Sequence, residues 1–367
     1  MTLRTGARGH GPRWYRSPVP NATHLAADHA AAPTAESDHI LVYASQRQPS
    51  HILSYVDQIV GIEGTPTPGV ELRFFEGKLP HTDMDVVHLH RSSVLLGKGS
   101  RWKRLARMAD FVLQARRRKI AVVRTLTPAD VNGQGGRLRQ AANLLLDQVT
   151  TSYVVLDETT RTPRSRPVTV IPHAHYRERF LGYPRSETVP GRVLRIGAAL
   201  PKNTAGALGG LLLTETPGLT LRVVGKPAEG GTFRLKALAE RDPERVSVLL
   251  EKISDGSTVQ EITAAELVLV PKVTELEDMQ VLYLALSLDR PVLVPATELT
   301  RRLAEKVGPG WVTLYDGTLG PETVDAAVAG LRATPPTGSP QLDAPDLEAT
   351  SEMYLKVFRE AAAAVQR

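Results

Sequence analysis

Leu194-Arg-Ile-Gly-Ala-Ala-Leu-Pro-Lys-Asn203 decides the fold, because it joins a short apolar segment, a glycine turn and a polar loop. The same order, followed by a helical pattern, recurs along most of the chain. The apolar segments are continuous rather than alternating, which is typical of strands buried on both faces of a parallel sheet. The repetition therefore predicts an α/β architecture.

Two successive sets of apolar segments share this pattern. The first set is Ile40–Tyr43, Val70–Phe75, Val86–His90, Ile120–Leu126, Tyr153–Leu156 and Val168–Ile171. The second set is Val193–Gly197, Leu219–Val224, Val246–Leu250, Leu267–Val270, Val292–Val294 and Val312–Tyr315. Helical patterns between them include Trp102–Arg117, Leu138–Gln148, Val259–Ala265, Met279–Leu288 and Thr300–Val307. We expect two Rossmann-like, doubly wound parallel-sheet domains that face each other across a cleft.

The expected domain bounds follow from changes in composition. Residues 1–37 are rich in Gly, Pro, Ala and Arg without periodicity, which predicts a disordered or loosely packed tail. The two Rossmann-like domains are expected at 38–180 and 190–335. A proline-rich linker then leads to a helix within 345–367, at about Ala349–Val365, which has room to cross back to the first domain.

The composition excludes several classes of protein. The chain has no cysteine, so it holds no disulfide, thiolate metal site or cysteine nucleophile. No stretch approaches the roughly 20 apolar residues of a membrane span, and the N-terminus lacks the apolar core of a secretory signal. We expect a cytoplasmic protein, with the inner face of the cell membrane as a peripheral location. The net charge of +6 favours anionic partners.

Several segments resemble bacterial exopolysaccharide glycosyltransferases of the B fold. In the first half these are Asp85-Val-Val-His-Leu-His90 and Val170-Ile-Pro-His-Ala-His-Tyr176. In the second half they are 194–203, Leu221-Arg-Val-Val-Gly225, Glu266-Leu-Val-Leu-Val-Pro271 and 282–292. The resemblance spans about Ile40 to Leu319. It implies transfer of a hexose from a nucleoside-diphosphate sugar, as co-substrate and without cofactor or essential metal, to a polysaccharide, glycolipid or lipid-linked acceptor.

The chain also departs from the family pattern. Relatives that retain anomeric configuration often carry two glutamates eight positions apart, and these positions fall on Leu276 and Leu284. Ala198 and Ala199 stand where an arginine is common, and Thr127 where a histidine is common. The alternative is therefore a non-catalytic relative that binds nucleotide or carbohydrate or acts as an assembly partner.

The expected nucleotide-sugar site lies after the strands of the second domain. Glycines after the first two strands, Gly197 and Gly225, would let the backbone approach a ligand closely or would simply form turns. Lys202 and Asn203 follow in the loop, where the lysine can neutralise the leaving diphosphate. Lys272 and Glu275 come after a later strand. Asp278 is expected to cap a helix that begins at Met279 and Gln280 and binds the diphosphate through free N–H groups.

The catalytic base is expected in the first domain, because every histidine lies at or before His175. His90, Asp130 and His173 are the candidates for deprotonating an acceptor hydroxyl. Two His-x-His pairs also allow a zinc site, but no acid is spaced with them, so no metal is expected. Asp83-Met-Asp85 precedes a strand instead of following one, which indicates a turn.

The segment from Lys98 to Lys119 is strongly basic, with Asp110 as its one acid. Trp102, Leu105, Ala109, Val112 and Leu113 recur in it at helical spacing, so we expect an amphipathic helix packed on the sheet. Its polar face is either solvated or bound to an anionic membrane surface. No recognition module or aromatic platform accompanies it, so nucleic acid is not the expected partner. A solute-binding protein is a further alternative, although it would need an export signal.

Overall fold

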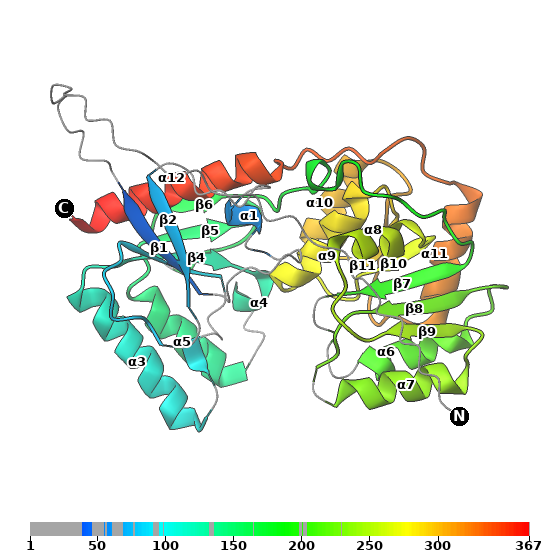
Figure 1. The fold of residues 1–367 in the computed structure, drawn as a ribbon, viewed down its shortest axis with the longest axis horizontal. Helices are drawn as coiled ribbons and strands as arrows, with labels where there is room; N and C mark the ends of the chain where they lie inside the picture. The colour runs from blue at the N-terminus through cyan, green and yellow to red at the C-terminus, as the bar shows by residue number, and fades with distance from the viewer. Residues whose placement is uncertain are drawn as a thin grey trace, which may run out of the picture. The chain divides into compact units, whose positions relative to one another are not determined.

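A computed structural model describes residues 39–45, 55, 57–60, 69–75, 78–90, 95–97, 99–131, 136–163, 165–197, 200, 204–228 and 230–366 (Figure 1). The predicted tail at 1–37 lies outside these residues, as do Lys98, Lys202 and Asn203. The described chain contains two six-stranded sheets, and every strand pairing within them is parallel. The predicted doubly wound α/β fold is confirmed.

The first sheet has the strand order β2-β1-β3-β4-β5-β6. Its strands are β1 (Ile40–Ala44), β2 (Val70–Phe74), β3 (Val86–Leu89), β4 (Ala121–Leu126), β5 (Ser152–Val155) and β6 (Val168–Val170). Its helices are α1 (Asp57–Val60), α3 (Arg101–Arg117), α4 (Pro128–Val131) and α5 (Gly136–Asp147). Asp85 fastens the amino ends of β1 and β3, because its Oδ2 accepts a hydrogen bond from the Leu41 amide at 2.8 Å.

Helices cover both faces of the first sheet (Figure 1). On one face, Val87 and Val122 pack with Met108 and Phe111 of α3. On the other face lies α12 (Leu347–Gln366), which contacts β1, β3 and β4. Phe358 of α12 is fully buried in the same core cluster as Val86. The last helix of the described chain therefore completes the core of the first sheet.

The second sheet has the strand order β12-β11-β10-β7-β8-β9. Its strands are β7 (Arg192–Ile196), β8 (Thr220–Val224), β9 (Val246–Leu249), β10 (Leu267–Leu269), β11 (Val292–Pro295) and β12 (Val312–Tyr315). Its helices are α6 (Thr204–Gly209), α7 (Gly231–Arg241), α8 (Asp255–Thr263), α9 (Leu276–Ser287), α10 (Glu298–Val307) and α11 (Pro321–Ala333), and the 3₁₀ turns η1 (Glu178–Phe180) and η2 (Gly210–Leu213) complete the set.

Each sheet has one place where the strand order reverses, which we call its switch point. In the first sheet β1 is flanked by β2 and β3, and in the second β7 is flanked by β8 and β10. Loops leave the carboxyl ends of the central strands in opposite directions at such a point, which opens a crevice that ligands occupy. The loops after β1 and β3, and those after β7 and β10, are therefore the places to search for a site.

Candidate active site

Gly197 and Gly225 bring two backbones of the second sheet together after β7 and β8. The Gly197 amide donates to the Val224 carbonyl at 3.1 Å. Gly225 has a φ of +129°, and a Cβ placed on it would lie 1.9 Å from the Gly197 oxygen. Position 225 therefore requires glycine, because the backbone at Gly197 approaches it too closely for a side chain. A direct contact of either glycine with a ligand stays a prediction.

Arg195 is a cation at this switch point that the sequence analysis missed. It lies on β7, is buried, and donates from Nη1 to the Ile196 carbonyl at 2.5 Å. Burial lowers the pKa of its guanidinium, and the charge of Asp278 acts in the opposite direction. The sequence signal was an arginine between the apolar residues Leu194 and Ile196, because a charge on a buried strand needs a partner.

The start of α9 differs from the sequence prediction. The helix begins at Leu276 rather than Met279, so Asp278 is its third residue and not its cap. Asp278 Oδ2 instead accepts from the amides of Glu275 and Thr274, at 3.3 and 3.4 Å. This is one half of a capping box, which a Glu-x-x-Asp spacing can form. Met279 and Gln280 are consequently buried inside the helix and do not present its first N–H groups.

Asp278 lies in a partly buried environment. Burial raises the pKa of its carboxyl, while the backbone hydrogen bonds and the charge of Arg195 lower it in part. Glu275, the residue before the helix, binds Arg139 of α5 at 3.0 Å. Lys272 is exposed on the loop that follows β10. The chain thus gathers Arg195, Asp278 and Glu275 near the switch point, with Lys272 on the adjoining loop.

Asp130 is fully engaged in hydrogen bonds. Its Oδ2 accepts from the Thr127 hydroxyl at 3.0 Å and from the Thr127 amide at 3.3 Å. Its Oδ1 accepts from Arg139 Nη2 at 2.8 Å and from Nε at 3.2 Å. These donors occupy the lone pairs of both carboxylate oxygens. This geometry suits a structural link between α4 and α5 better than proton transfer.

His90 and His173 follow β3 and β6 and are both buried. The ring of His90 stacks on Tyr55, with centroids 5.4 Å apart. The ring of His173 stacks on Tyr283 of α9 at 5.0 Å, and its Nδ1 lies 3.0 Å from the Ala174 carbonyl. Since a carbonyl only accepts, Nδ1 carries the proton and Nε2 keeps its lone pair.

Within the described structure, His173 leaves one buried ring nitrogen unengaged, unlike the carboxylate of Asp130. Among the described atoms, its Nε2 has no hydrogen-bond partner. Burial lowers the pKa of the imidazole to about 4, although the Ala174 carbonyl raises it in part. Burial therefore favours the neutral form of the ring, and it makes proton uptake by Nε2 less favourable than in water.

His88 has a different environment, beneath α12. Its Nε2 lies 2.9 Å from the Thr125 hydroxyl, and its ring packs on Phe358 with centroids 5.4 Å apart. Burial lowers the pKa of this imidazole to about 3. The described residues contain no group of three or more histidine or acidic side chains placed to hold a metal ion.

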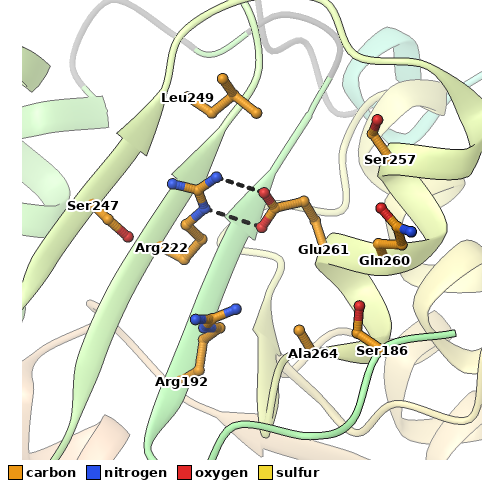
Figure 2. A pocket seen from close by; sticks show the side chains of 9 residues that line it. All are labelled: Ser186, Arg192, Arg222, Ser247, Leu249, Ser257, Gln260, Glu261 and Ala264. Carbon is orange, nitrogen blue, oxygen red and sulfur yellow. Dashed lines mark hydrogen bonds and ion pairs between the residues drawn. The ribbon is translucent and has the colours of Figure 1, made fainter.

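A hollow of about 380 Å³ lies between the second sheet and α8 (Figure 2). Arg222 of β8 and Glu261 of α8 form a two-bond ion pair there, at 3.0 and 2.5 Å, with Arg192 beside it. The lining of the hollow runs from Arg192, the first residue of β7, to Leu249, the last residue of β9, whose carbonyl accepts a hydrogen bond from the Gly225 amide at 2.9 Å. One end of this hollow therefore adjoins the strand end next to Gly225.

No protein-family model matches the chain. A GDP-mannose:glycolipid 4-β-D-mannosyltransferase of Xanthomonas campestris pv. campestris is 33% identical over 282 residues, which are 76% of this chain and 80% of the relative. None of the described helices is long and apolar enough to cross a membrane.

Two solved structures share the fold at low identity. HepE of Anabaena, in complex with UDP and glucose, has a TM-score of 0.57 at 12% identity and covers 87% of this chain and 99% of its own. The UDP-GlcNAc 2-epimerase of Neisseria meningitidis, bound to UDP-GlcNAc, has a TM-score of 0.52 at 12% identity and covers 88% of this chain and 100% of its own. The 33% identity with the Xanthomonas mannosyltransferase shows that the chain belongs to the family of that enzyme. The chain is therefore a glycosyltransferase of the B fold that moves a sugar from a nucleoside-diphosphate sugar to an acceptor.

Proposed function

We propose that the chain transfers mannose from GDP-mannose to the sugar of a glycolipid in exopolysaccharide biosynthesis. The observation that carries this proposal is the 33% identity, over 76% of the chain, with a relative named for that donor and that acceptor class. The acceptor would bind at the carboxyl edge of the first sheet and the donor at the switch point of the second.

The proposed reaction inverts the anomeric carbon. GDP-mannose is an α-glycoside, so a β-mannoside product requires one displacement from the opposite face. The acceptor hydroxyl attacks C1, the bond from C1 to the phosphate oxygen breaks, and GDP leaves with the electron pair. Leu276 and Leu284 support this course, because both are buried core residues where retaining relatives carry glutamates. A single displacement needs one base and no second carboxylate.

His173 is the proposed base. The lone pair of its Nε2, which has no hydrogen-bond partner among the described atoms, supports this role. The proton of the acceptor hydroxyl would pass to Nε2 as the oxygen attacks. Arg195 and Lys202 are proposed to stabilise the negative charge that develops on the leaving diphosphate. With these cations at the diphosphate, turnover should persist in excess EDTA, and loss of turnover in EDTA would contradict metal independence.

Nucleotide binding tests the donor. The free energy of unfolding should rise with GDP or GDP-mannose, by roughly 2.7 kcal/mol at 100 times the dissociation constant, and not with UDP or ADP at equal concentration. Lys202→Ala should weaken the effect. Stabilisation by UDP alone would overturn the choice of donor.

Product analysis tests the chemistry. Incubation with GDP-mannose and a glycolipid acceptor should give a β-mannoside, identified by NMR of the anomeric centre. An α-mannoside would exclude the single displacement, and no product across a panel of glycolipids would exclude the acceptor class.

A further inference from the structure

Helix α3 has an apolar stripe on the side that faces away from the sheet. Trp102, Ala106, Ala109 and Leu113 are spaced by four, three and four residues, so they lie on one face of the helix. All four are exposed, Trp102 at 79% and Leu113 at 45%. The inner face is formed by other residues, which are Met108, Phe111, Val112 and Ala115. Packing on the sheet accounts for the inner face and leaves the outer stripe unexplained.

The apolar spacing predicts this helix at its observed position but does not distinguish its inner from its outer apolar face. Val112 packs inward as expected, whereas Trp102, Ala109 and Leu113 are exposed. Helical spacing alone cannot separate two apolar stripes on one helix when the charges lie between them.

Helix α5 adds one exposed apolar residue beside α3. It packs beside α3 on the same face of the first sheet (Figure 1). Arg116 Nη2 of α3 donates to Gln148 Oε1, just beyond α5, at 3.1 Å. Leu144 of α5 is 67% exposed. We call Trp102, Ala106, Ala109, Leu113 and Leu144 together the α3–α5 surface.

Basic side chains border the α3–α5 surface. Arg101, Lys103, Arg116 and Arg117 are exposed, and Asp110 is the one acidic residue of α3. Among the residues that the structure describes, none of these four forms an ion pair with an acidic side chain. An exposed aromatic and aliphatic stripe with arginines at its edges is the chemistry of an interfacial helix on an anionic bilayer.

The α3–α5 surface reaches the edge where the acceptor would bind. A helix between two parallel strands runs back against their direction, so its first turn lies at the carboxyl ends of the strands. Trp102 is the second residue of α3, which places it at the same edge of the first sheet as His90 and His173. A bilayer that contacts Trp102 would therefore border the loops proposed to hold the acceptor.

We propose that the α3–α5 surface docks on an anionic phospholipid bilayer. Trp102, Leu113 and Leu144 enter the interfacial region, while the arginines and Lys103 contact headgroup phosphates. This deepens the proposed function and rests on it in one respect, since a glycolipid acceptor is held in a bilayer. Docking then supplies the acceptor by diffusion in two dimensions to the edge that carries His173.

Vesicle flotation of the full chain tests the docking. The wild type should float with vesicles of phosphatidylcholine and phosphatidylglycerol, and far less with phosphatidylcholine alone. Trp102→Ala/Leu113→Ala should abolish flotation. Arg116→Gln/Arg117→Gln should weaken it roughly 30-fold, since each basic residue near a charged surface contributes about a fivefold factor. Brominated lipids should quench wild-type fluorescence and not that of Trp102→Phe.

A matched control lies on the second sheet. Phe233 of α7 is an aromatic residue at 80% exposure, so Phe233→Ala removes comparable apolar surface away from α3. It should float like the wild type. Equal flotation of Trp102→Ala/Leu113→Ala and Phe233→Ala, failure of the wild type to bind anionic vesicles, or binding of duplex DNA in place of vesicles would each overturn the proposal.

Turnover separates this proposal from the proposed function. With GDP-mannose and a water-soluble acceptor analogue, Trp102→Ala/Leu113→Ala should keep wild-type rates, and with acceptor in vesicles its rate should fall. Flotation that depends on Trp102 without any mannose transfer would refute the function and keep the docking. Mannose transfer without flotation would refute the docking and keep the proposed function.

Discussion

His173 is the residue on which the proposed chemistry depends. His173→Asn should lower kcat by about 10²- to 10⁴-fold while the affinity for GDP is kept, because the ring acts on the acceptor proton and not on the nucleotide. The matched control is His175→Asn, since His175 lies two residues away and contacts Glu178 at 3.2 Å. Steady-state kinetics and GDP titration measure both effects. Equal losses in the two variants would remove His173 from the reaction.

The two buried histidines make stability depend on pH. The pKa values of His88 and His173 lie at about 3 and about 4 in the folded chain, below the ordinary 6.5 of an exposed imidazole. The unfolded chain therefore binds more protons below pH 6.5, and acid favours it. Each histidine should cost about 1.4 kcal/mol of unfolding free energy per pH unit, between pH 6.5 and 4.

Urea unfolding at pH 7, 6 and 5 checks this dependence. His88→Asn should flatten the slope by the share of one histidine, because an amide can accept the Thr125 hydrogen bond without titrating. An unchanged slope would mean that His88 is not neutral and buried in solution.

At the scale of elements, the turn after β8 requires a glycine at position 225. Gly225→Ala should destabilise the chain by about 2–4 kcal/mol, because a Cβ there meets the Gly197 carbonyl in a backbone conformation that side chains avoid. The control is Gly330→Ala in α11, where nothing lies within 4 Å of the new Cβ and helix propensity predicts a gain of about 0.5–1 kcal/mol. Thermal unfolding measures both changes, and tolerance of Gly225→Ala would show that the turn can rearrange.

Elements could be predicted where their burial produces a recognisable apolar pattern in the sequence. The segments of both sheets were found because strands covered on both faces are continuous in Val, Leu and Ile. The start of α9 was missed because Asp278 resembles a usual cap and Glu275 does not. Leu276 belongs to the helix because it packs in the core, which only the tertiary structure reveals. The roles of Arg195 and of the His173 Nε2 could not be predicted for the same reason, because each role depends on the residues that surround the group in the fold.

The whole molecule depends on α12 for the first sheet. Phe358→Ala should cost about 3–5 kcal/mol, because it empties a buried site against His88 and Tyr354. Hydrogen exchange should lose protection in β1, β3 and β4 before β7, β8 and β10. Phe233→Ala should change stability by less than about 0.5 kcal/mol, since its ring is exposed. Uniform loss of protection in both sheets would mean that they unfold as one unit.

The return of α12 also orders events during synthesis. Residues 40–170 leave the ribosome with one face of their sheet uncovered, and Ser351, Tyr354 and Phe358 arrive only after the whole second sheet has emerged. Domains generally fold as units during translation, from the N-terminus onward. Here the second sheet can complete its fold first, while the first sheet still exposes an apolar face to which chaperones can bind. Slow translation or truncation near residue 346 would therefore damage the half of the protein that was made first.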